Sequence, residues 1–365
     1  MIVLHVAQIE ITPESGMGRV AWHWREALTR RGHRFVHIGR RPLDRDVHPA
    51  AYPLSALAAA RRIAPDADVV LAHEPAAAAF LTSRRPTIAF SHGIERRGWA
   101  AARAFMAVSG ERIALRSRIT YPLWRLRPCD RAMRGAEGAL VINREDYDYC
   151  IQRYGRTPER TFQFRNGVDP VARAPRTQGT PATLLFLGSW LARKGTRTLV
   201  DAAIALHAQG VRPRWLLAGT GVSAPEVLGA FPEALRPSIE VIERFHARDE
   251  VALHARATLL VLPSFFEGQP LALLQAMAAA LPVVTSDCCG QRDLVAHGEN
   301  GLLFPRGDAV ALAACIERCL ADPALRARLG DAARASVAGR EWPHCADEAA
   351  EFIERIHAAF PRVRG

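Results

Sequence analysis

The sequence lacks the segments that carry a protein into or across a membrane. Its N-terminus, MIVLHVAQ, has no basic region ahead of a short apolar run, so no signal peptide is predicted. No stretch reaches the roughly 18 uninterrupted apolar residues of a membrane span. The longest candidate is broken by Gln275 and Pro282. We therefore expect a cytoplasmic protein.

The cysteine spacing predicts neither a disulfide framework nor a metal site. The seven cysteines fit a reducing compartment, in which they serve as small buried residues. Cys315 and Cys319 stand one helical turn apart and Cys288 and Cys289 are adjacent, but no second pair has the spacing of a zinc site. We expect neither a metal nor a cofactor.

The sequence has no recognisable nucleic-acid reader, although its net charge is +11 and its pI is near 10. No basic run is interleaved with stacking aromatics in the manner of an RNA- or DNA-binding sheet, so we expect no nucleic-acid partner. The chain of 365 residues, 49% of them hydrophobic, is long enough for two domains with separate cores.

Arginines are concentrated in residues 96–134, where few acidic residues accompany them. Aromatic and apolar residues lie among them, including Trp99, Tyr121 and Trp124. Such a segment suits peripheral contact with an anionic membrane surface, to which each nearby cation contributes roughly 1 kcal/mol. The alternative is a solvated, arginine-rich helical face.

Short apolar strands alternate with helices along most of the chain. Strands are predicted at residues 2–7, 34–38, 69–72 and 87–90, and again at 183–188, 215–219, 239–245 and 258–262. The pattern predicts an α/β protein with two doubly wound domains and with ligands at the carboxyl ends of the strands. We place the domains at residues 1–172 and 182–344, joined by a linker rich in Pro, Gly, Thr and Arg.

Three strand ends in the first domain carry candidate site residues. A loop with Gly16, Gly18 and Arg19 follows the first strand and precedes a helix predicted from about residue 20, and glycine lets the backbone approach a phosphate closely. The spacing is not G-x-G-x-x-G and the second strand does not end in an acidic residue, so an NAD site is not favoured. His73 and His92 follow the next two strands, where a lone histidine is more often structural.

The second domain carries cations and glycines at corresponding positions. Arg193 and Lys194 follow its first strand and suit phosphate groups, with a pair of solvated cations as the alternative. Gly219 and Gly221 form a turn after the second strand.

The stretch LPSFFEGQPLALLQAMAAALPVV, residues 262–284, combines a strand end, a polar loop and an apolar helix after Pro270. Helix starts expose free N–H groups and favour anions. The candidate donors are the N–H groups of Gly268, Gln269 and Leu271. Glu267 stands beside this position and Gln275 lies further along the helix. Taken locally, both are also compatible with solvated side chains.

The order P-S-x-x-E-G-x-P-L-x-x-L-x-A-M-A in this stretch resembles the donor-binding signature of the retaining family 4 glycosyltransferases. The resemblance covers nearly the whole chain and implies a GT-B fold, with two Rossmann-like domains facing a central cleft and a final helix, residues 345–365, packing back on the first domain. It also implies transfer of a hexose from a nucleotide sugar to a glycan or lipid-linked acceptor, as in surface polysaccharide or lipopolysaccharide synthesis.

The same resemblance implies particular residue roles. Glu267 and His92 would orient the transferred sugar, Arg193 and Lys194 would face the diphosphate without a metal, and Gln275 would hold the ribose. The glycine positions would line the donor site: Gly16, Gly18, Gly219, Gly221 and Gly268. Family members have an acidic residue where Gln275 stands, and many have an arginine where Ser189 stands.

Other activities remain open at this stage. A catalytically silent nucleotide-sugar-binding scaffold at the membrane would also account for Gln275 and Ser189. A GT-B epimerase or phosphorylase is a further alternative, for which the residues give no specific signal.

Overall fold

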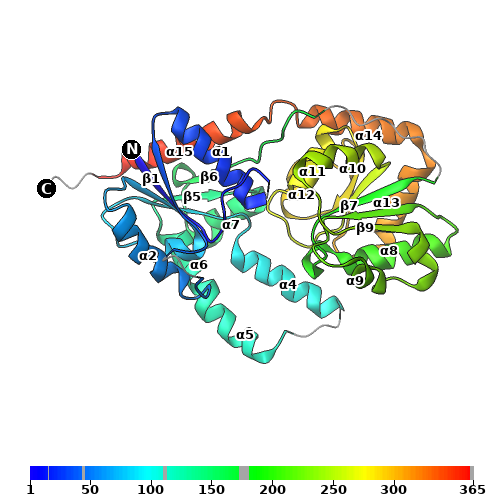
Figure 1. The fold of residues 1–365 in the computed structure, drawn as a ribbon, viewed down its shortest axis with the longest axis horizontal. Helices are drawn as coiled ribbons and strands as arrows, with labels where there is room; N and C mark the ends of the chain where they lie inside the picture. The colour runs from blue at the N-terminus through cyan, green and yellow to red at the C-terminus, as the bar shows by residue number, and fades with distance from the viewer. Residues whose placement is uncertain (15, 43–45, 110–112, 172–180, 362–365) are drawn as a thin grey trace. The chain divides into compact units, whose positions relative to one another are not determined.

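The computed structural model describes residues 1–14, 16–42, 46–109, 113–171 and 181–361. They form two compact units, each built on its own parallel sheet (Figure 1). The first unit takes Met1–Arg103, Glu111–Gly167 and Trp342–Gly365, and the second takes Ala104–Gly110 and Val168–Glu341. The predicted linker, residues 172–181, lies outside the described residues except for Pro181.

The sheet of the first unit has six parallel strands in the order β2-β1-β3-β4-β5-β6. The chain runs outward from β1 to β2 and then crosses to β3, so the strand order reverses between β1 and β3. In open α/β sheets, ligands bind at such a reversal, outside the carboxyl ends of the strands. The strands are β1 (Ile2–Val6), β2 (Arg34–Ile38), β3 (Val69–His73), β4 (Thr87–Phe90), β5 (Gly138–Val141) and β6 (Thr161–Gln163).

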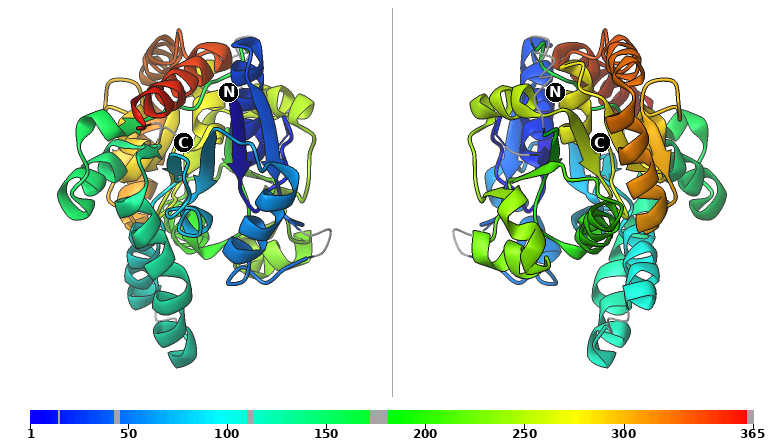
Figure 2. Two further views of the ribbon diagram at one scale, coloured as in Figure 1. Left: turned by 90° about the vertical axis from the view of Figure 1, so that its left-hand side faces the viewer. Right: turned by 90° about the vertical axis from the view of Figure 1, so that its right-hand side faces the viewer.

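Helices flank both faces of this sheet (Figures 1 and 2). They are α1 (Gly16–Arg30), α2 (Tyr52–Ile63), α3 (Glu74–Ala77), α4 (Glu95–Ser109, up to Arg103 in this unit), α5 (Leu115–Tyr121), η1 (Pro122–Leu126), α6 (Arg127–Gly135), α7 (Arg144–Tyr154), η2 (Pro158–Arg160) and α15 (Trp342–Ala359).

The second unit repeats the plan with the strand order β12-β11-β10-β7-β8-β9, all parallel. The order reverses between β7 and β10. The strands are β7 (Thr183–Leu187), β8 (Arg214–Ala218), β9 (Ile239–Ile242), β10 (Leu259–Leu262), β11 (Val283–Ser286) and β12 (Leu302–Phe304).

The helices of the second unit include several single turns. They are η3 (Ala192–Lys194), α8 (Thr196–Ala208), α9 (Ala224–Gly229), η4 (Glu233–Ser238), η5 (Ala247–Asp249), α10 (Glu250–Arg256), α11 (Leu271–Ala278), α12 (Cys289–Leu294), α13 (Ala309–Ala321) and α14 (Pro323–Ser336).

The cores form where apolar strands are covered on both faces. The central strands β4, β5, β10 and β11 are buried along their whole length, as expected for parallel sheets between helix layers. In the first unit, α15 packs along α1, and His23 stacks on Trp342 with ring centroids 4.4 Å apart.

The helix boundaries differ from the sequence-based expectation at two ends. Helix α1 begins at Gly16 rather than near residue 20, so Gly16, Gly18 and Arg19 lie in its first turns and not in a loop. The final helix begins at Trp342, three residues before the predicted start, and Trp342 itself is buried. In the described part of the chain, no helix combines the length and apolar character that crossing a bilayer requires.

One buried polar side chain in the second unit makes its stability depend on pH. His254 on α10 is 1% exposed, and neither ring nitrogen has a hydrogen-bond partner among the described residues. Burial lowers the pKa of His254 to about 4. The folded protein therefore resists a proton that the unfolded chain accepts near pH 6.5.

We predict that the free energy of unfolding falls as the pH is lowered from 6.5 to 4, with up to about 3 kcal/mol due to His254. In His254→Leu this part of the pH dependence should disappear, as measured by urea unfolding of the full chain at several pH values. The partly exposed His207 on α8 offers a control, and His207→Leu should leave the slope unchanged. An equal slope in wild type and His254→Leu would contradict the prediction.

Candidate active site

In the second unit, the segments that follow β7 and β10 meet at the point where the strand order reverses. After β7 the backbone turns through Gly188, with φ +153°, and through Gly195, with φ +73°. A Cβ atom on Gly195 would lie 1.9 Å from the carbonyl oxygen of Pro263, so only glycine fits this close approach. The β7 segment is thereby pressed against the β10 segment.

The close contact between Gly195 and Pro263 brings Lys194 and Glu267 together. Lys194 Nζ lies 2.5 Å from Glu267 Oε1, and both side chains are largely buried. Arg193 Nη1 lies 3.9 Å from Glu267 Oε2, with its side chain 54% exposed. Lys194 is the only lysine in the sequence.

The ion pair keeps Glu267 charged in spite of its burial. Burial alone would raise the pKa of this carboxyl, but the positive charges of Lys194 and Arg193 outweigh it and hold the pKa below its ordinary value. The site therefore contains a carboxylate that is ionised at neutral pH and is bound by the side chain of Lys194.

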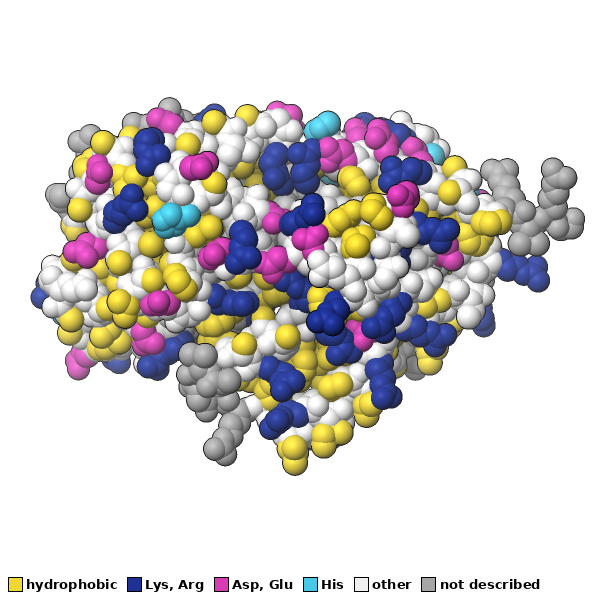
Figure 3. All heavy atoms as spheres, turned by 180° about the vertical axis from the view of Figure 1, so that it is seen from behind, with side chains coloured by type: hydrophobic (Ala, Val, Ile, Leu, Met, Phe, Trp, Pro, Cys, Tyr) yellow, Lys and Arg dark blue, Asp and Glu magenta, His cyan; other side chains and the backbone are white. Residues whose placement is uncertain are grey.

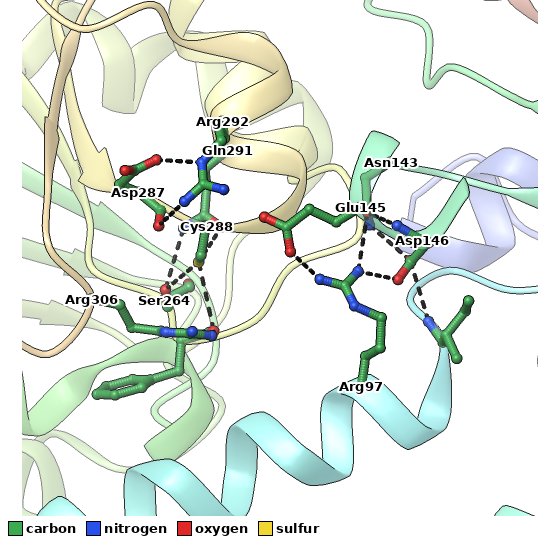
Figure 4. Close-up of polar contacts among 12 residues, drawn as sticks. Arg97, Asn143, Glu145, Asp146, Ser264, Asp287, Cys288, Gln291, Arg292 and Arg306 are labelled. Atoms are coloured by element: carbon green, nitrogen blue, oxygen red, sulfur yellow. Dashed lines mark hydrogen bonds and ion pairs between the residues drawn. The ribbon is translucent and has the colours of Figure 1, made fainter. Parts of the chain in front are cut away.

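The loop from β10 to α11 is held by side chains from in and around α12 and from the segment after β12 (Figure 4). The carbonyl oxygen of Ser264 accepts hydrogen bonds from Gln291 Nε2 at 3.4 Å and from Cys288 Sγ at 3.4 Å. Arg306 donates to the carbonyl of Phe265 at 2.9 Å. Buried carbonyls need such partners, and these fix the backbone that presents Glu267.

The remaining predicted donor residues lie around the start of α11, which begins at Leu271 after Pro270. Gly268 packs so closely on Gly290 that a Cβ on Gly290 would lie 1.7 Å from the Gly268 carbonyl oxygen. Gln269 is buried and its Oε1 accepts a hydrogen bond from Arg340 at 2.6 Å. Gln275 lies on α11 and is 9% exposed, so it is not the solvated amide that the local alternative describes.

The predicted glycine turn after β8 adopts the backbone that glycine favours. Gly219 and Gly221 have φ values of +73° and +71°. The N–H groups of both donate to carbonyls at the end of β9, to Ile242 at 2.8 Å and Glu243 at 3.0 Å. This turn is a rigid part of the second unit's carboxyl edge.

In the first unit, the residues predicted to line the donor lie at the amino end of α1. Gly18 and Arg19 are buried, and Arg19 donates from Nε to the carbonyl of Pro13 at 2.6 Å. Ser15, which precedes Gly16 in the predicted loop, lies outside the described residues. The guanidinium of Arg19 thus supports the chain before α1.

A pocket of about 140 Å³ lies at the reversal of the first sheet, outside the ends of β1, β3 and β4. His73 and His92 both line it, with ring centroids 6.4 Å apart and planes inclined by 21°. Its walls are otherwise mostly apolar or aromatic, with one cation; the other lining residues include Gln8, Met17, Tyr52, Phe90 and Arg125.

Both histidines are neutral in this pocket. Burial lowers the pKa of His73 to about 3, helped by the nearby charge of Arg125. Burial likewise lowers the pKa of His92 to about 3, helped by His73. At neutral pH the two rings can accept and donate hydrogen bonds but bring no positive charge.

Three of the arginines counted as surface cations are used inside the first unit. Arg97 pairs with Glu145 and with the buried Asp146, which also accepts from the Asn143 side chain at 2.8 Å (Figure 4). Arg96 donates to Asp130 at 2.8 Å, and Arg125 donates to Glu95 at 2.9 Å. The α4 part of segment 96–134 is therefore less available to an external partner than its composition suggests.

Sequence reasoning missed three polar residues beside the histidine pocket. A carboxylate oxygen of Glu74, a carboxylate oxygen of Glu95 and Cys129 Sγ lie within 4.8 Å of one another. Glu95 is already bound by Arg125 and by the Tyr121 hydroxyl, and burial raises the pKa of the Cys129 thiol far above its usual range. The available signal was the position of Glu74, directly after a strand that ends in His73.

Comparison with known proteins places the second unit in a family. Residues 181–322 match the family model for glycosyl transferases group 1. Residues 181–322 belong to that family. The putative colanic acid biosynthesis glycosyltransferase WcaL of Salmonella typhimurium is 33% identical over 182 residues, 45% of this chain and 43% of WcaL. The chain spans about half the length of the curated relatives that it matches.

Solved structures confirm the predicted GT-B fold across nearly the whole chain. Sucrose-phosphate synthase from Thermosynechococcus elongatus superposes with a TM-score of 0.77 and 19% identity, covering 98% of this chain and 99% of the synthase. WaaG, a glycosyltransferase involved in lipopolysaccharide biosynthesis, gives a TM-score of 0.74 with 17% identity, covering 96% of this chain and 99% of WaaG.

Proposed function

We propose that this protein is a retaining glycosyltransferase that moves a hexose from a nucleotide sugar to a glycan or lipid-linked acceptor. The observation that carries the proposal is the Lys194–Glu267 ion pair at the sheet reversal of the family-matched unit. One ammonium and one carboxylate, side by side at the edge where α/β sheets bind ligands, suit a donor that has both an anionic and a hydroxyl-bearing part.

The donor diphosphate is the partner of the cations. Lys194, Arg193 and the N–H groups at the start of α11 stabilise the negative charge that grows on the leaving phosphate. In this proposal the cations do the work for which other transferases use a metal, and the reaction is metal-independent. The ionised Glu267 accepts hydrogen bonds from sugar hydroxyls, and Gln275 does the same for the ribose.

The neutral histidine pocket serves the saccharide part of the reaction. An uncharged His92 orients sugar hydroxyls without attracting the diphosphate. The bond from the anomeric carbon to phosphate breaks, a bond to the acceptor oxygen forms on the same face, and the departing phosphate takes the acceptor proton. The names of WcaL and WaaG support surface polysaccharide or lipopolysaccharide as the setting.

We further propose that α5 brings the protein to the inner face of the cytoplasmic membrane. Residues 115–120 of α5 are exposed, Tyr121 is partly buried, and no residue of the helix is fully buried. Leu115, Ile119 and Leu123, spaced by four residues along α5 and η1, are 70%, 59% and 48% exposed. They form one apolar stripe along α5 and η1, and at the end of α5 Tyr121 stacks on Trp99 of α4.

The charges around this stripe favour an anionic lipid surface. Exposed arginines flank it at positions 116, 118, 127, 131 and 134, and none of these pairs with a carboxylate among the described residues. Asp130, which lies among the last three of these arginines in the sequence, is buried and bound by Arg96 and Tyr154. Figure 3 shows apolar and basic side chains mixed along the edge of the molecule where α5 lies.

Replacing Lys194 by alanine should lower turnover by about 100- to 1,000-fold, because the leaving phosphate loses its closest cation. Release of nucleoside diphosphate from the donor measures this. Arg197→Ala, which removes an exposed cation of α8 paired with Asp201, is the matched control and should retain near-normal turnover. Near-normal activity of the Lys194 variant would remove the assigned role.

A thermal-shift panel of UDP-, GDP-, ADP- and dTDP-sugars should identify the donor. A ligand at about 100 times its dissociation constant stabilises a protein by roughly 2.7 kcal/mol. One nucleotide class should raise the melting temperature of the wild type more than that of Glu267→Ala. If no class does, the second unit does not bind a nucleotide sugar and the proposed function fails.

The double variant Leu115→Ser, Ile119→Ser should lose most binding to vesicles of phosphatidylcholine with phosphatidylglycerol, measured by co-sedimentation. The apolar stripe then no longer inserts, while the remaining arginine attraction is weak and screened by salt. Val310→Ser removes a residue of α13 that is 74% exposed and should bind as the wild type does. Equal binding of all three proteins, or a wild type that dimerises instead of binding vesicles, would refute the proposal.

A further inference from the structure

The loop that carries His92 is fixed by side chains rather than by a turn of backbone hydrogen bonds. Three successive backbone N–H groups donate to three side-chain oxygens: Gly93 to Ser91 Oγ at 3.2 Å, Ile94 to Asp146 Oδ2 at 3.3 Å, and Glu95 to Glu74 Oε1 at 2.9 Å. These hydrogen bonds fix the backbone on both sides of His92 and so fix the position of its ring.

Glu74 occupies the centre of this arrangement. Its Oε1 accepts from the Ser91 hydroxyl at 2.9 Å as well as from the Glu95 N–H, so it binds both ends of the loop. Glu74 is also the first residue of α3 and is covalently joined to His73. It is 1% exposed, which leaves it no solvent-exposed alternative.

One side chain therefore connects the two imidazoles of the pocket. His73 is fixed through the backbone next to Glu74, and His92 through the loop that Glu74 holds. The rings, 6.4 Å apart, are stacked on neighbouring strand ends and line the same cavity.

We propose that Glu74 is a positioning residue that sets the spacing of His73 and His92 and thereby the shape of the saccharide pocket. The proposal rests on the proposed function in one respect, namely that this pocket serves the transfer reaction. Glu74 itself is too deeply buried to touch the substrate.

The surroundings of Glu74 indicate which form of the carboxyl does this work. Glu95 of α4, Asp146 of α7 and Cys129 of α6 face it, and its Oε2 has no partner among the described residues. Arg125 forms its ion pair with Glu95 and not with Glu74. Burial, helped by Glu95, raises the pKa of Glu74 to about 8, so the neutral acid predominates at pH 7.

Glutamine has nearly the same shape as a protonated glutamate, so Glu74→Gln tests whether the neutral carboxyl is the form that positions the loop. In Glu74→Gln the amide oxygen can accept the same two hydrogen bonds from Ser91 and Glu95. In Glu74→Ala both donors lose their acceptor, and the loop is freed. Asp130→Asn serves as the matched control, because Asp130 is also a buried acid with several partners but does not contact the loop.

The first measurement needs no substrate. The full chain is labelled at histidine and its ring signals are followed by NMR from pH 5 to 9, with His73→Gln and His92→Gln used for assignment. In the wild type both rings should stay neutral down to pH 5, and their signals should shift near pH 8 as Glu74 ionises. Glu74→Gln should keep the neutral rings and lose the shift near pH 8.

In Glu74→Ala, His73 and His92 should titrate close to pH 6.5, because the loosened loop admits water. Asp130→Asn should behave as the wild type does. If Glu74→Ala leaves both rings neutral and unshifted, or if Asp130→Asn changes them equally, the positioning role is wrong.

Turnover is the second readout and separates the two proposals. With UDP-glucose as the probe for donor cleavage, Glu74→Ala should lower kcat by about 10- to 100-fold with little change in KM, as small misplacements of a site do. If the ring signals respond as expected but the wild type cleaves none of the UDP-, GDP-, ADP- and dTDP-sugars, the positioning role stands and the proposed function falls. If cleavage is normal in Glu74→Ala while its rings move, the pocket is not part of the reaction.

Discussion

The ion pair between Lys194 and Glu267 is the contact on which the second unit's functional edge depends. A charged carboxylate can remain buried only beside a cation, and the two residues are 73 positions apart in the chain. Gly195 lets its backbone contact that of Pro263, and Gly290 allows the backbone of Gly268 to approach closely. Gln291 and Cys288 donate hydrogen bonds to the carbonyl of Ser264. Together these contacts keep one ammonium next to one carboxylate.

The first unit uses buried carboxyls for a different purpose. Burial is the main cause that raises the pKa of both Glu74 and Asp146, and each accepts a hydrogen bond from a backbone N–H group, while Asp146 is also paired with Arg97. The two units differ in strand order, but both are parallel sheets with candidate site residues at a reversal of strand order. They differ in electrostatics, since one edge is charged and the other presents neutral imidazoles and apolar walls.

Much of this architecture could be predicted from the sequence because the strands and motifs are each formed by a short run of consecutive residues. Strands such as residues 34–38 and 87–90 appear where apolar runs predicted them, and the GT-B fold followed from the order of motifs. The start of α1 was misplaced because Gly16 and Gly18 are poor helix formers that the tertiary structure nevertheless keeps helical. The pairing of Arg96 and Arg97 was not visible, because their carboxylate partners lie 34 and 49 residues away. Glu74 was missed for the same reason.

The absence of every lysine but one has a chemical consequence. Apart from the α-amino group of Met1, the protein contains a single aliphatic amine, and that amine is the partner of Glu267. Guanidinium groups, which supply the rest of the positive charge, do not react with ordinary acylating reagents or aldehydes. Stable acylation of amines on this chain is therefore confined to Met1 and Lys194, and the number of amide-linked acyl groups reports whether the Lys194–Glu267 pair of the second unit is open, covered or disrupted.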